Sequence, residues 1–194
     1  ALGVDVTLLD DATLATGDLS AFDTIVVGIR ASQARPAFVA NNGRLLDFAR
    51  SGGTLVIQYQ QPDYADKELA PFEARMDGSV RVVDETAPVR ILEPRHPVFT
   101  YPNRIVAADF DGWVQERNNY NFTRFDRERY VPLTEAHDEG EPESDGAMLY
   151  ARLGDGHFVY TSYSWFRQLP NGVPGAYRLF ANLISLPAAP GESR

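Results

Sequence analysis

The feature that constrains this chain most is a short apolar run at residues 54–57, with the sequence TLVI. Two glycines, Gly52 and Gly53, precede it and are typical of the end of a helix. A continuous apolar run rich in β-branched residues predicts a strand covered on both faces, as in a parallel sheet. In open α/β sheets the carboxyl end of such a strand is where ligands bind and nucleophiles lie. Here residues 58–61 read QYQQ and contain no Ser, Cys or acid.

Composition narrows the possible functions. The net charge of −9 argues against nucleic-acid binding and against attachment to anionic membranes, since both need concentrated Lys and Arg. The sequence has no run of about 18 apolar residues, so no membrane insertion is expected. The chain also has no cysteine, which excludes disulfides, thiolate zinc sites and cysteine nucleophiles.

The length and the two ends bear on domain organisation. The 194 residues suit one domain, which we place at residues 1–187. The tail at 188–194 belongs to a segment rich in Pro, Gly and Ser, and it is expected to be flexible. The opening residues ALG resemble the last turn of a helix, followed by a strand. We therefore expect the chain to be a piece of a longer protein.

The first third of the chain predicts alternating strands and helices. Apolar runs at 3–9 and 23–29 predict two strands in addition to the one at 54–58. Between the last two, residues 41–53 predict a helix with one apolar face and an asparagine cap. This order is typical of a doubly wound α/β sheet.

The rest of the chain predicts short strands and a final helix. A hairpin is predicted at 146–165, because two alternating runs flank the turn GDG. Apolar residues at helical spacing and Pro174 in the first turn predict a closing helix that ends before Pro187. The acidic loop at 138–146 is interpreted as a solvated turn. Further strands are predicted at 79–85, 87–94 and 129–138.

The residues that most often carry catalysis are sparse. No G-x-S-x-G or G-x-C-x-G elbow occurs, and the histidines His96, His137 and His157 are not spaced as metal ligands. We therefore expect structural roles for all three. Asp109 and Asp111 would share one face of a strand, so they could do acid–base work or hold a hard cation. They could equally cap backbone amides at the start of a loop. No metal site is assigned, and this pair stands as a weak candidate.

Two segments, 109–126 and 160–178, mix aromatic side chains with amides and arginine. Flat rings beside directional hydrogen-bonding groups are typical of a sugar or peptide site. Alternatively, the aromatic residues are core and the polar ones cap turns. The residues concerned are Trp113, Gln115, Glu116, Arg117, Asn118, Asn119 and Tyr120 in the first segment, and Tyr163, Trp165, Phe166, Arg167, Gln168 and Asn171 in the second.

Several motifs together resemble a known family. DTIVVGIRA and RLLDFARSGGTLVIQY resemble the central strands and elbow of the class I glutamine-amidotransferase-like fold. ARLGDGHFVYTSYSWFRQLPNGVPGAYRLFANLISL resembles its end, where a strand leads to the triad His and a helix follows. With DFDGWVQER, the set is similar to the accessory domain of bacterial PIG-L (LmbE-like) deacetylase proteins. The resemblance covers about residues 3 to 187 and implies a flavodoxin-like parallel sheet with helices on both faces and an added β-hairpin region.

The departures from the family pattern decide what the resemblance implies about activity. Gln58, Tyr59 and Gln60 stand where the class I elbow carries its Cys, and Tyr163 to Trp165 stand where its His follows the strand. Glutaminase chemistry needs both groups. The resemblance therefore implies a non-catalytic accessory domain without a cofactor, which would bind a carbohydrate or pack on a neighbouring catalytic domain of the same polypeptide. The glycan-related context favours a secreted or periplasmic location.

Two alternatives remain open. One is an atypical hydrolase that uses Tyr59 as acid or base with Asp109 or Glu116. The other is a purely structural module that presents an apolar patch to a partner. The fold should bring Arg30 and the elbow to the same edge of the sheet as residues 163–165. The ligand-binding residues that we hypothesise are Arg30, Gln58, Tyr59, Gln60, Trp113, Gln115, Glu116, Arg117, Tyr163, Trp165, Arg167 and Gln168.

Overall fold

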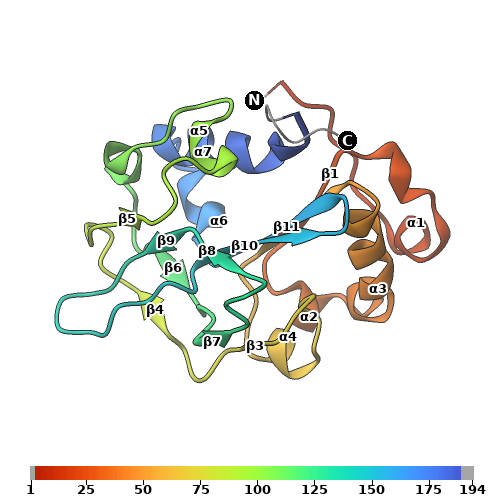
Figure 1. Cartoon of the computed structure of the whole chain (residues 1–194), viewed down its shortest axis with the longest axis horizontal. Coiled ribbons are helices and arrows are strands. Elements are labelled where there is room, and N and C mark those ends of the chain that lie inside the picture. Colours follow the sequence, from red (N-terminus) through yellow and green to blue (C-terminus); the bar gives the residue numbers. More distant parts are fainter. Residues whose placement is uncertain (1–2, 189–194) are drawn as a thin grey trace.

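The computed structural model describes residues 3–188, whose centre is a five-stranded sheet in the order β1-β2-β11-β10-β8 (Figure 1). The strands β1 (Thr24–Val27), β2 (Thr54–Gln58) and β11 (Gly156–Thr161) run parallel to one another. The strands β10 (Met148–Leu153) and β8 (Val131–Pro132) complete the sheet in antiparallel pairings. The prediction of an α/β fold around a mostly parallel sheet is confirmed.

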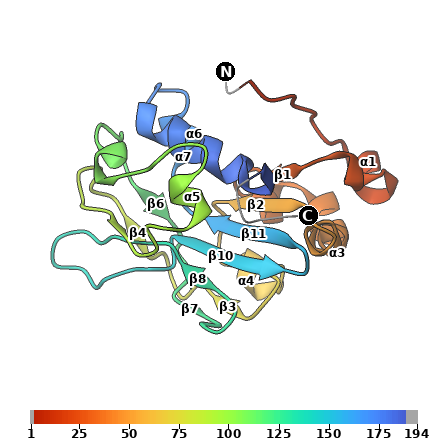
Figure 2. The same cartoon turned by 45° about the horizontal axis from the view of Figure 1, so that its top comes forward.

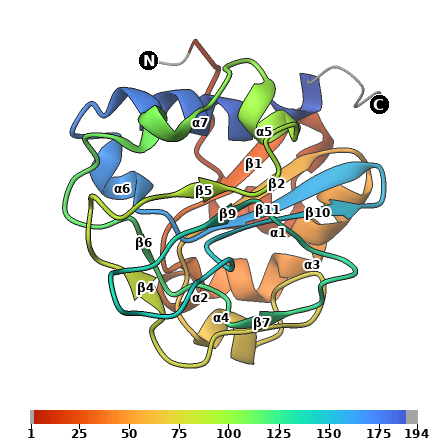
Figure 3. The ribbon, with the colours of Figure 1, turned by 60° about the vertical axis from the view of Figure 1, so that its left-hand side comes forward.

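Helices cover both faces of this sheet, as Figure 3 shows. Leu55 and Ile57 of β2 belong to the core cluster that contains α3 (Pro36–Arg50), with α1 (Asp11–Thr16) packed against that helix. Val56 belongs to the opposite cluster, which contains α7 (Pro174–Ile184). Successive side chains of a strand point to opposite faces. The continuous apolar run at 54–57 is therefore explained by burial on both sides.

The two long helices were predicted with different accuracy. The closing helix α7 begins at Pro174 and ends at Ile184, as its sequence signals indicate. The helix predicted at 41–53 begins earlier, because Pro36 occupies its first turn and α3 ends at Arg50. Proline is favoured at the first helical position, where its missing N–H leaves no hydrogen bond unmade. The asparagine cap was therefore wrong.

The predicted hairpin is formed by β10 and β11, but it is not an addition to the sheet. β11 pairs in parallel with β2 from His157 opposite Thr54 to Thr161 opposite Gln58. It is thus the third strand of the parallel core, and the expectation of an added hairpin region is corrected. A buried strand is needed beside β2 because both edges of a central strand must be paired.

The strand predicted at 3–9 does not form. This segment is an extended coil outside the sheet (Figure 2), and Val6 and Leu8 are 84% and 93% exposed. A strand exists only through hydrogen bonds with a neighbour, and no strand of the described residues pairs with the outer edge of β1. An alternating apolar pattern alone was therefore insufficient.

The middle of the chain contains only short strands, so the strands predicted at 79–85, 87–94 and 129–138 were too long. Three two-stranded pairs form there: β3 (Ala74–Arg75) with β7 (Arg124–Phe125), β4 (Arg81–Val82) with β6 (Asn118–Asn119), and β5 (Arg90–Ile91) with β9 (Thr134–Glu135). The short helices are α2 (Ala31–Ala34), α4 (Asp63–Asp66), α5 (Pro97–Thr100) and α6 (Trp165–Gln168), with 3-10 turns at Leu19–Ala21, Ala107–Phe110 and Leu186–Ala188.

Two expectations about the ends fall outside the described residues. These are the helix end at residues 1–2 and most of the flexible tail, residues 189–194. Within residues 3–188, the longest apolar helices are too short to cross a bilayer.

Candidate functional site

The carboxyl end of β2 is held in place by the side chain of Gln60, which is completely buried. Its Oε1 accepts a hydrogen bond from the Ser32 backbone N–H at 3.0 Å. Its Nε2 donates to the carbonyl oxygens of Gly28 and Gln58, each at 2.9 Å. One amide thus connects the ends of β1 and β2 with the start of α2. All its donors and its acceptor are used within the protein.

An exposed chain of hydrogen bonds begins beside this amide. Arg30 has a left-handed backbone (φ 54°), and its N–H donates to the Tyr59 carbonyl at 2.9 Å. The Arg30 guanidinium donates twice to Gln33 Oε1, each time at 3.1 Å, and Gln33 Nε2 donates to Gln61 Oε1 at 2.7 Å. Gln61 Nε2 then donates to the Tyr59 hydroxyl at 3.2 Å. We call Arg30, Gln33 and Gln61 the amide chain.

Three aromatic rings lie at the same edge of the sheet, and we call them the aromatic row: Tyr120, Tyr59 and Phe166. The centroid of the Tyr59 ring is 5.7 Å from that of Tyr120, in a stacked arrangement, and 6.1 Å from that of Phe166. Phe166 is exposed and Tyr120 is half-buried, whereas Tyr59 between them is nearly covered. Aromatic pairs at such separations stabilise by about 1 kcal/mol each beyond area burial.

Arg167 connects the aromatic row with the segment 115–117. Its guanidinium carbon lies 5.1 Å from the centroid of the Phe166 ring, within the range of a cation–π contact. Its Nε donates to Glu116 Oε1 at 2.8 Å, and its Nη1 donates to Gln115. The negative charge of Glu116 is thereby balanced by Arg167 in an ion pair. Four non-glycine residues among those described have a left-handed backbone. Three of them, Arg30, Gln115 and Tyr120, lie at this edge.

The residues at the expected His position are core residues. Tyr163 and Trp165 are fully buried, and both rings pack against Trp113, with centroids 5.4 and 5.5 Å away. The Tyr163 hydroxyl donates to Thr134 Oγ1 at 3.1 Å. Burial raises the pKa of Tyr163 to about 12, although the Thr134 hydrogen bond and the charge of Arg117 act in the opposite direction. The phenol is therefore protonated at neutral pH.

Gln168 and Arg117 are buried, and the side chain of each connects loops through hydrogen bonds to their backbone. Gln168 Oε1 accepts from the Val114 N–H at 2.9 Å, while its Nε2 donates to the Val114 carbonyl at 3.0 Å. The Arg117 guanidinium donates to the carbonyls of Ala87, at 3.1 Å, and Phe110. No described carboxylate forms an ion pair with it. Burial lowers the pKa of Arg117, against opposing contributions led by Tyr163 and Asp111.

The hypothesised residues therefore divide into two groups. Exposed or half-buried positions at the carboxyl edge are Arg30, Gln58, Gln115, Glu116 and Arg167, with Tyr59 nearly covered among them. Buried positions that support the loops are Gln60, Trp113, Arg117, Tyr163, Trp165 and Gln168. In the second group, aromatic residues are core and polar residues satisfy loop backbone, as the alternative interpretation held.

The acidic pair is not brought together for chemistry. Asp109 Oδ2 accepts from the Val106 N–H at 2.8 Å, which caps a 3-10 turn, and its Oδ1 pairs with Arg178 at 2.7 Å. Asp111 is exposed. Among the described residues, no group of three or more His, Cys, Asp or Glu side chains could hold a metal ion.

The histidines have structural contacts. His96 caps α5 through Nδ1, which accepts from the Val98 N–H at 3.2 Å. His137 Nδ1 lies 2.8 Å from Glu135 Oε1. His157 is buried, and its Nδ1 lies 2.9 Å from the Tyr150 hydroxyl. None of the three lies in the aromatic row or the amide chain.

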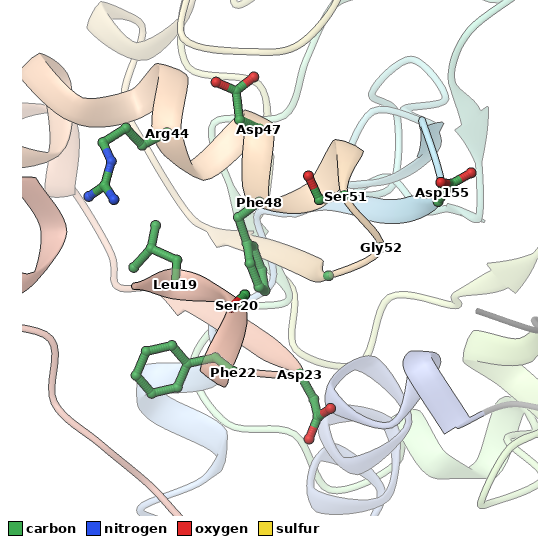
Figure 4. A pocket seen from close by; sticks show the side chains of 11 residues that line it. Leu19, Ser20, Phe22, Asp23, Arg44, Asp47, Phe48, Ser51, Gly52 and Asp155 are labelled. Carbon is green, nitrogen blue, oxygen red and sulfur yellow. The ribbon is translucent and has the colours of Figure 1, made fainter. Parts of the chain in front are cut away.

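One cavity lies at the opposite edge of the sheet, where the parallel strands begin (Figure 4). It has a volume of about 400 Å³ and is lined by Phe48, Arg44 and Asp47, among others. Arg44 is engaged, since its Nη2 donates to the Gly17 carbonyl at 2.6 Å, and Asp47 pairs with Arg50. Ligands of open α/β sheets bind at the carboxyl ends of the strands. This cavity is therefore not assigned as the site.

Sequence reasoning did not include four residues of this surface among the hypothesised ligands: Gln33, Gln61, Tyr120 and Phe166. Gln61 could have been found, because it continues the polar run after β2. Tyr120 and Phe166 lie in the two aromatic segments and differ from their neighbours only in exposure, which the sequence does not give. Gln33 carries no signal, because it reaches Gln61 from α2, 28 residues away in the chain.

Comparison with known proteins supports the fold. No family model and no curated protein sequence matches this chain. Its structure is similar to two cytoplasmic proteins of Salmonella typhimurium, STM3548 (TM-score 0.58, 16% identity) and STM1381 (0.57, 14%); each alignment covers 94% of this chain and 81% of the other. It is also similar to a β-galactosidase from Rahnella sp. R3, with a TM-score of 0.55 and 14% identity. That alignment covers 89% of this chain and 24% of the β-galactosidase chain. At these identities the similarity concerns the fold alone.

Proposed function

We propose that this chain is a non-catalytic, amidotransferase-like accessory domain that packs on a neighbouring catalytic domain through its carboxyl edge. The observation that carries the proposal is the aromatic row, which ends in the exposed ring of Phe166 at the edge where related folds place their chemistry. Exposed aromatic residues beside arginine are typical of the centre of protein interfaces.

The groups at this edge are unsuited to hydrolysis. A triad needs an activated nucleophile and a base. Tyr163, at the position expected for the base, is fully buried and keeps its proton far above neutral pH. The acids that an atypical hydrolase would use, Asp109 and Glu116, are both held in ion pairs with arginines, Arg178 and Arg167.

The geometry favours a protein partner over a stacked sugar. A sugar ring stacks on a free aromatic face, but Tyr59 has Tyr120 and Phe166 against it, and Arg167 lies over Phe166. Tyr120 and Phe166 contact Tyr59 but make no ring contact with each other, which is consistent with a row. What the row presents to solvent is the exposed Phe166 and the half-buried Tyr120, which suits packing against apolar side chains.

The resemblance of the sequence motifs to PIG-L deacetylase accessory domains supplies a context, in which the neighbour is a deacetylase catalytic domain. The similarity to about a quarter of a β-galactosidase chain is consistent with the same fold being one part of a larger enzyme. In such enzymes, inter-domain contacts of several hundred Å² are ordinary.

Hydrogen–deuterium exchange tests the proposal. The domain alone is compared with the polypeptide expressed from its whole gene, and we expect slower exchange in the polypeptide at residues 59–61, 119–121 and 165–168. The variant Phe166→Asp should remove that protection, whereas Val83→Asp, at an exposed position outside these segments, should not. Equal exchange in both forms, or equal effects of the two variants, would contradict domain packing.

A second candidate, binding of a hydroxylated ligand such as a glycan, is favoured by the amide chain. Its hydrogen bonds run in one direction from Arg30 to the Tyr59 hydroxyl, and no described acceptor takes the proton of that hydroxyl. A glycan panel tests this candidate. Binding that is lost in Gln61→Ala but kept in Phe166→Asp would favour the glycan over domain packing.

A further inference from the structure

The outer edge of β1 borders a groove that the described residues leave open. A cavity of about 560 Å³ is lined on one side by residues 24–29, which include all of β1, and on the other by residues 7–9. Leu14, Phe38 and Leu45 of the α1 and α3 layer form part of its wall. Val26, on the other face of β1, is 37% exposed. The groove therefore has a strand edge, an apolar wall and an extended segment around it.

The segment on the far side of the groove resembles a strand without a partner. Val4, Val6 and Leu8 alternate along it, and all three are exposed. Its end is fixed, because Arg35 Nη2 donates to the Leu9 carbonyl at 2.7 Å while Arg35 Nε donates to Asp11 at 2.8 Å. An alternating apolar run is typical of a strand that is paired and half-buried. Here it lies beside an unpaired strand edge and is itself unpaired.

The lining of the groove specifies the chemistry of what would fill it. Of the 17 lining residues, only Arg35 is charged, and it is already paired with Asp11. An uncharged occupant is therefore complementary. The row of backbone N–H and C=O groups along an edge strand is satisfied by another strand. Side chains that point to the α1 and α3 layer would have to be apolar, because they would lie against Leu14 and Phe38.

We propose that this groove accepts one extended, uncharged β-strand of about five residues, which pairs with β1 as a sixth strand of the sheet. Residues 4–9 would then cover the outer side of that strand. A second copy of the chain fits less well, since edge-to-edge pairing of two four-residue strands buries far less than the roughly 1,200 Å² of a stable interface. The inserted strand instead has walls on both sides.

A synthetic peptide serves as the probe, with the central run Val-Val-Ile-Val-Thr and flanking lysines for solubility. A control peptide has proline in place of the central isoleucine, because proline cannot donate to a ladder. We expect exchange of alternate backbone amides in β1 to slow at least tenfold with the first peptide and to stay unchanged with the control. Protection confined to the aromatic row, or no protection at β1, would overturn the proposal.

A pair of variants separates insertion from other binding. Leu8→Asp places a charge on the far wall of the groove, whereas Val106→Asp places one at an exposed site that does not line the groove. Loss of the apolar contact at Leu8 should weaken peptide binding about tenfold, and the control should bind like the parent chain. Equal affinity of both variants would overturn the proposal. So would protection of β1 that rises with protein concentration without peptide, since it would indicate a second copy.

Discussion

Gln60 offers the sharpest test of how the carboxyl edge is built. The side chain was a candidate ligand on sequence grounds, but the structure gives it three hydrogen bonds to protein backbone and no exposure. If this account is right, Gln60→Ala destabilises the fold. If Gln60 is instead a ligand-binding residue, the same change leaves stability intact and removes binding.

The magnitude follows from the contacts. Each intramolecular hydrogen bond contributes about 1 kcal/mol net, so three contribute about 3 kcal/mol. Removal of the one buried methylene group, Cγ, adds about 0.8 kcal/mol. A loss of about 4 kcal/mol is a large part of the 5–15 kcal/mol that stabilises an ordinary domain. For a chain of this size it lowers Tm by roughly 10 °C.

The assay is thermal and urea unfolding followed by circular dichroism, with Gln33→Ala as the control. Gln33 is an exposed amide at the same edge, and its truncation should change stability by less than about 0.5 kcal/mol. Gln60→Glu adds a pH test. Its carboxylate would face the carbonyls of Gly28 and Gln58, so the variant should be less stable at pH 7 than at pH 4.5, relative to the parent chain. A stability equal to the parent in both Gln60 variants would refute the reasoning.

Substitutions of Tyr163, Arg117, Gly156 and Gly43 give further predictions. Tyr163 has an ordinary pKa near 10 in the unfolded chain and a pKa of about 12 in the folded one. Its contribution to the free energy of unfolding is therefore complete below pH 10 and is lost as the pH rises from 10 to 12. Tyr163→Phe should reduce the fall in unfolding free energy there by about 1.4 kcal/mol per pH unit. Arg117→Lys should cost about 2 kcal/mol in urea unfolding, because an ammonium cannot bridge the Ala87 and Phe110 carbonyls as a guanidinium fork does. Gly156→Ala should cost about 2 kcal/mol, since a Cβ there would lie 2.2 Å from two backbone oxygens. Gly43→Ala, in open space on α3, should instead stabilise by about 0.5 kcal/mol.

The parts of the fold that were predictable are those in which the local pattern and the final environment agree. The run at 54–57 is continuous because helices cover both faces of β2, and the runs that flank the GDG turn are adjacent in the chain and pair with each other. The segment 3–9 has an equally strong pattern, but a strand needs a neighbour, and nothing in the segment indicates whether one is present. The sequence also could not show that the hairpin lies within the sheet, because β11 meets β2 across about 100 residues of chain.

The candidate site was predictable in position but not in the role of each residue. The topology brings Arg30 and the end of β2 to one edge, and the chain order alone implies this. Gln60 and Gln61 are adjacent and chemically identical, yet one is buried with every polar atom paired to backbone and the other joins an exposed chain. Both accept a hydrogen bond from α2, but Gln60 also donates to the carbonyls at the ends of β1 and β2, whereas Gln61 donates to the Tyr59 hydroxyl. Burial of Trp165 and exposure of Phe166 depend in the same way on which side of α6 faces the sheet.

The phenols of Tyr59 and Tyr163 are both held by packing, and this has a consequence for function. Tyr59 is fixed by Tyr120 and Phe166, and Tyr163 by Trp113 and Thr134. A catalytic side chain must be reachable, whereas both phenols are covered and are held by neighbouring rings. The edge of the sheet therefore has a fixed aromatic surface with Phe166 at its exposed end, and the proposed packing on a neighbouring domain would use such a pre-organised surface.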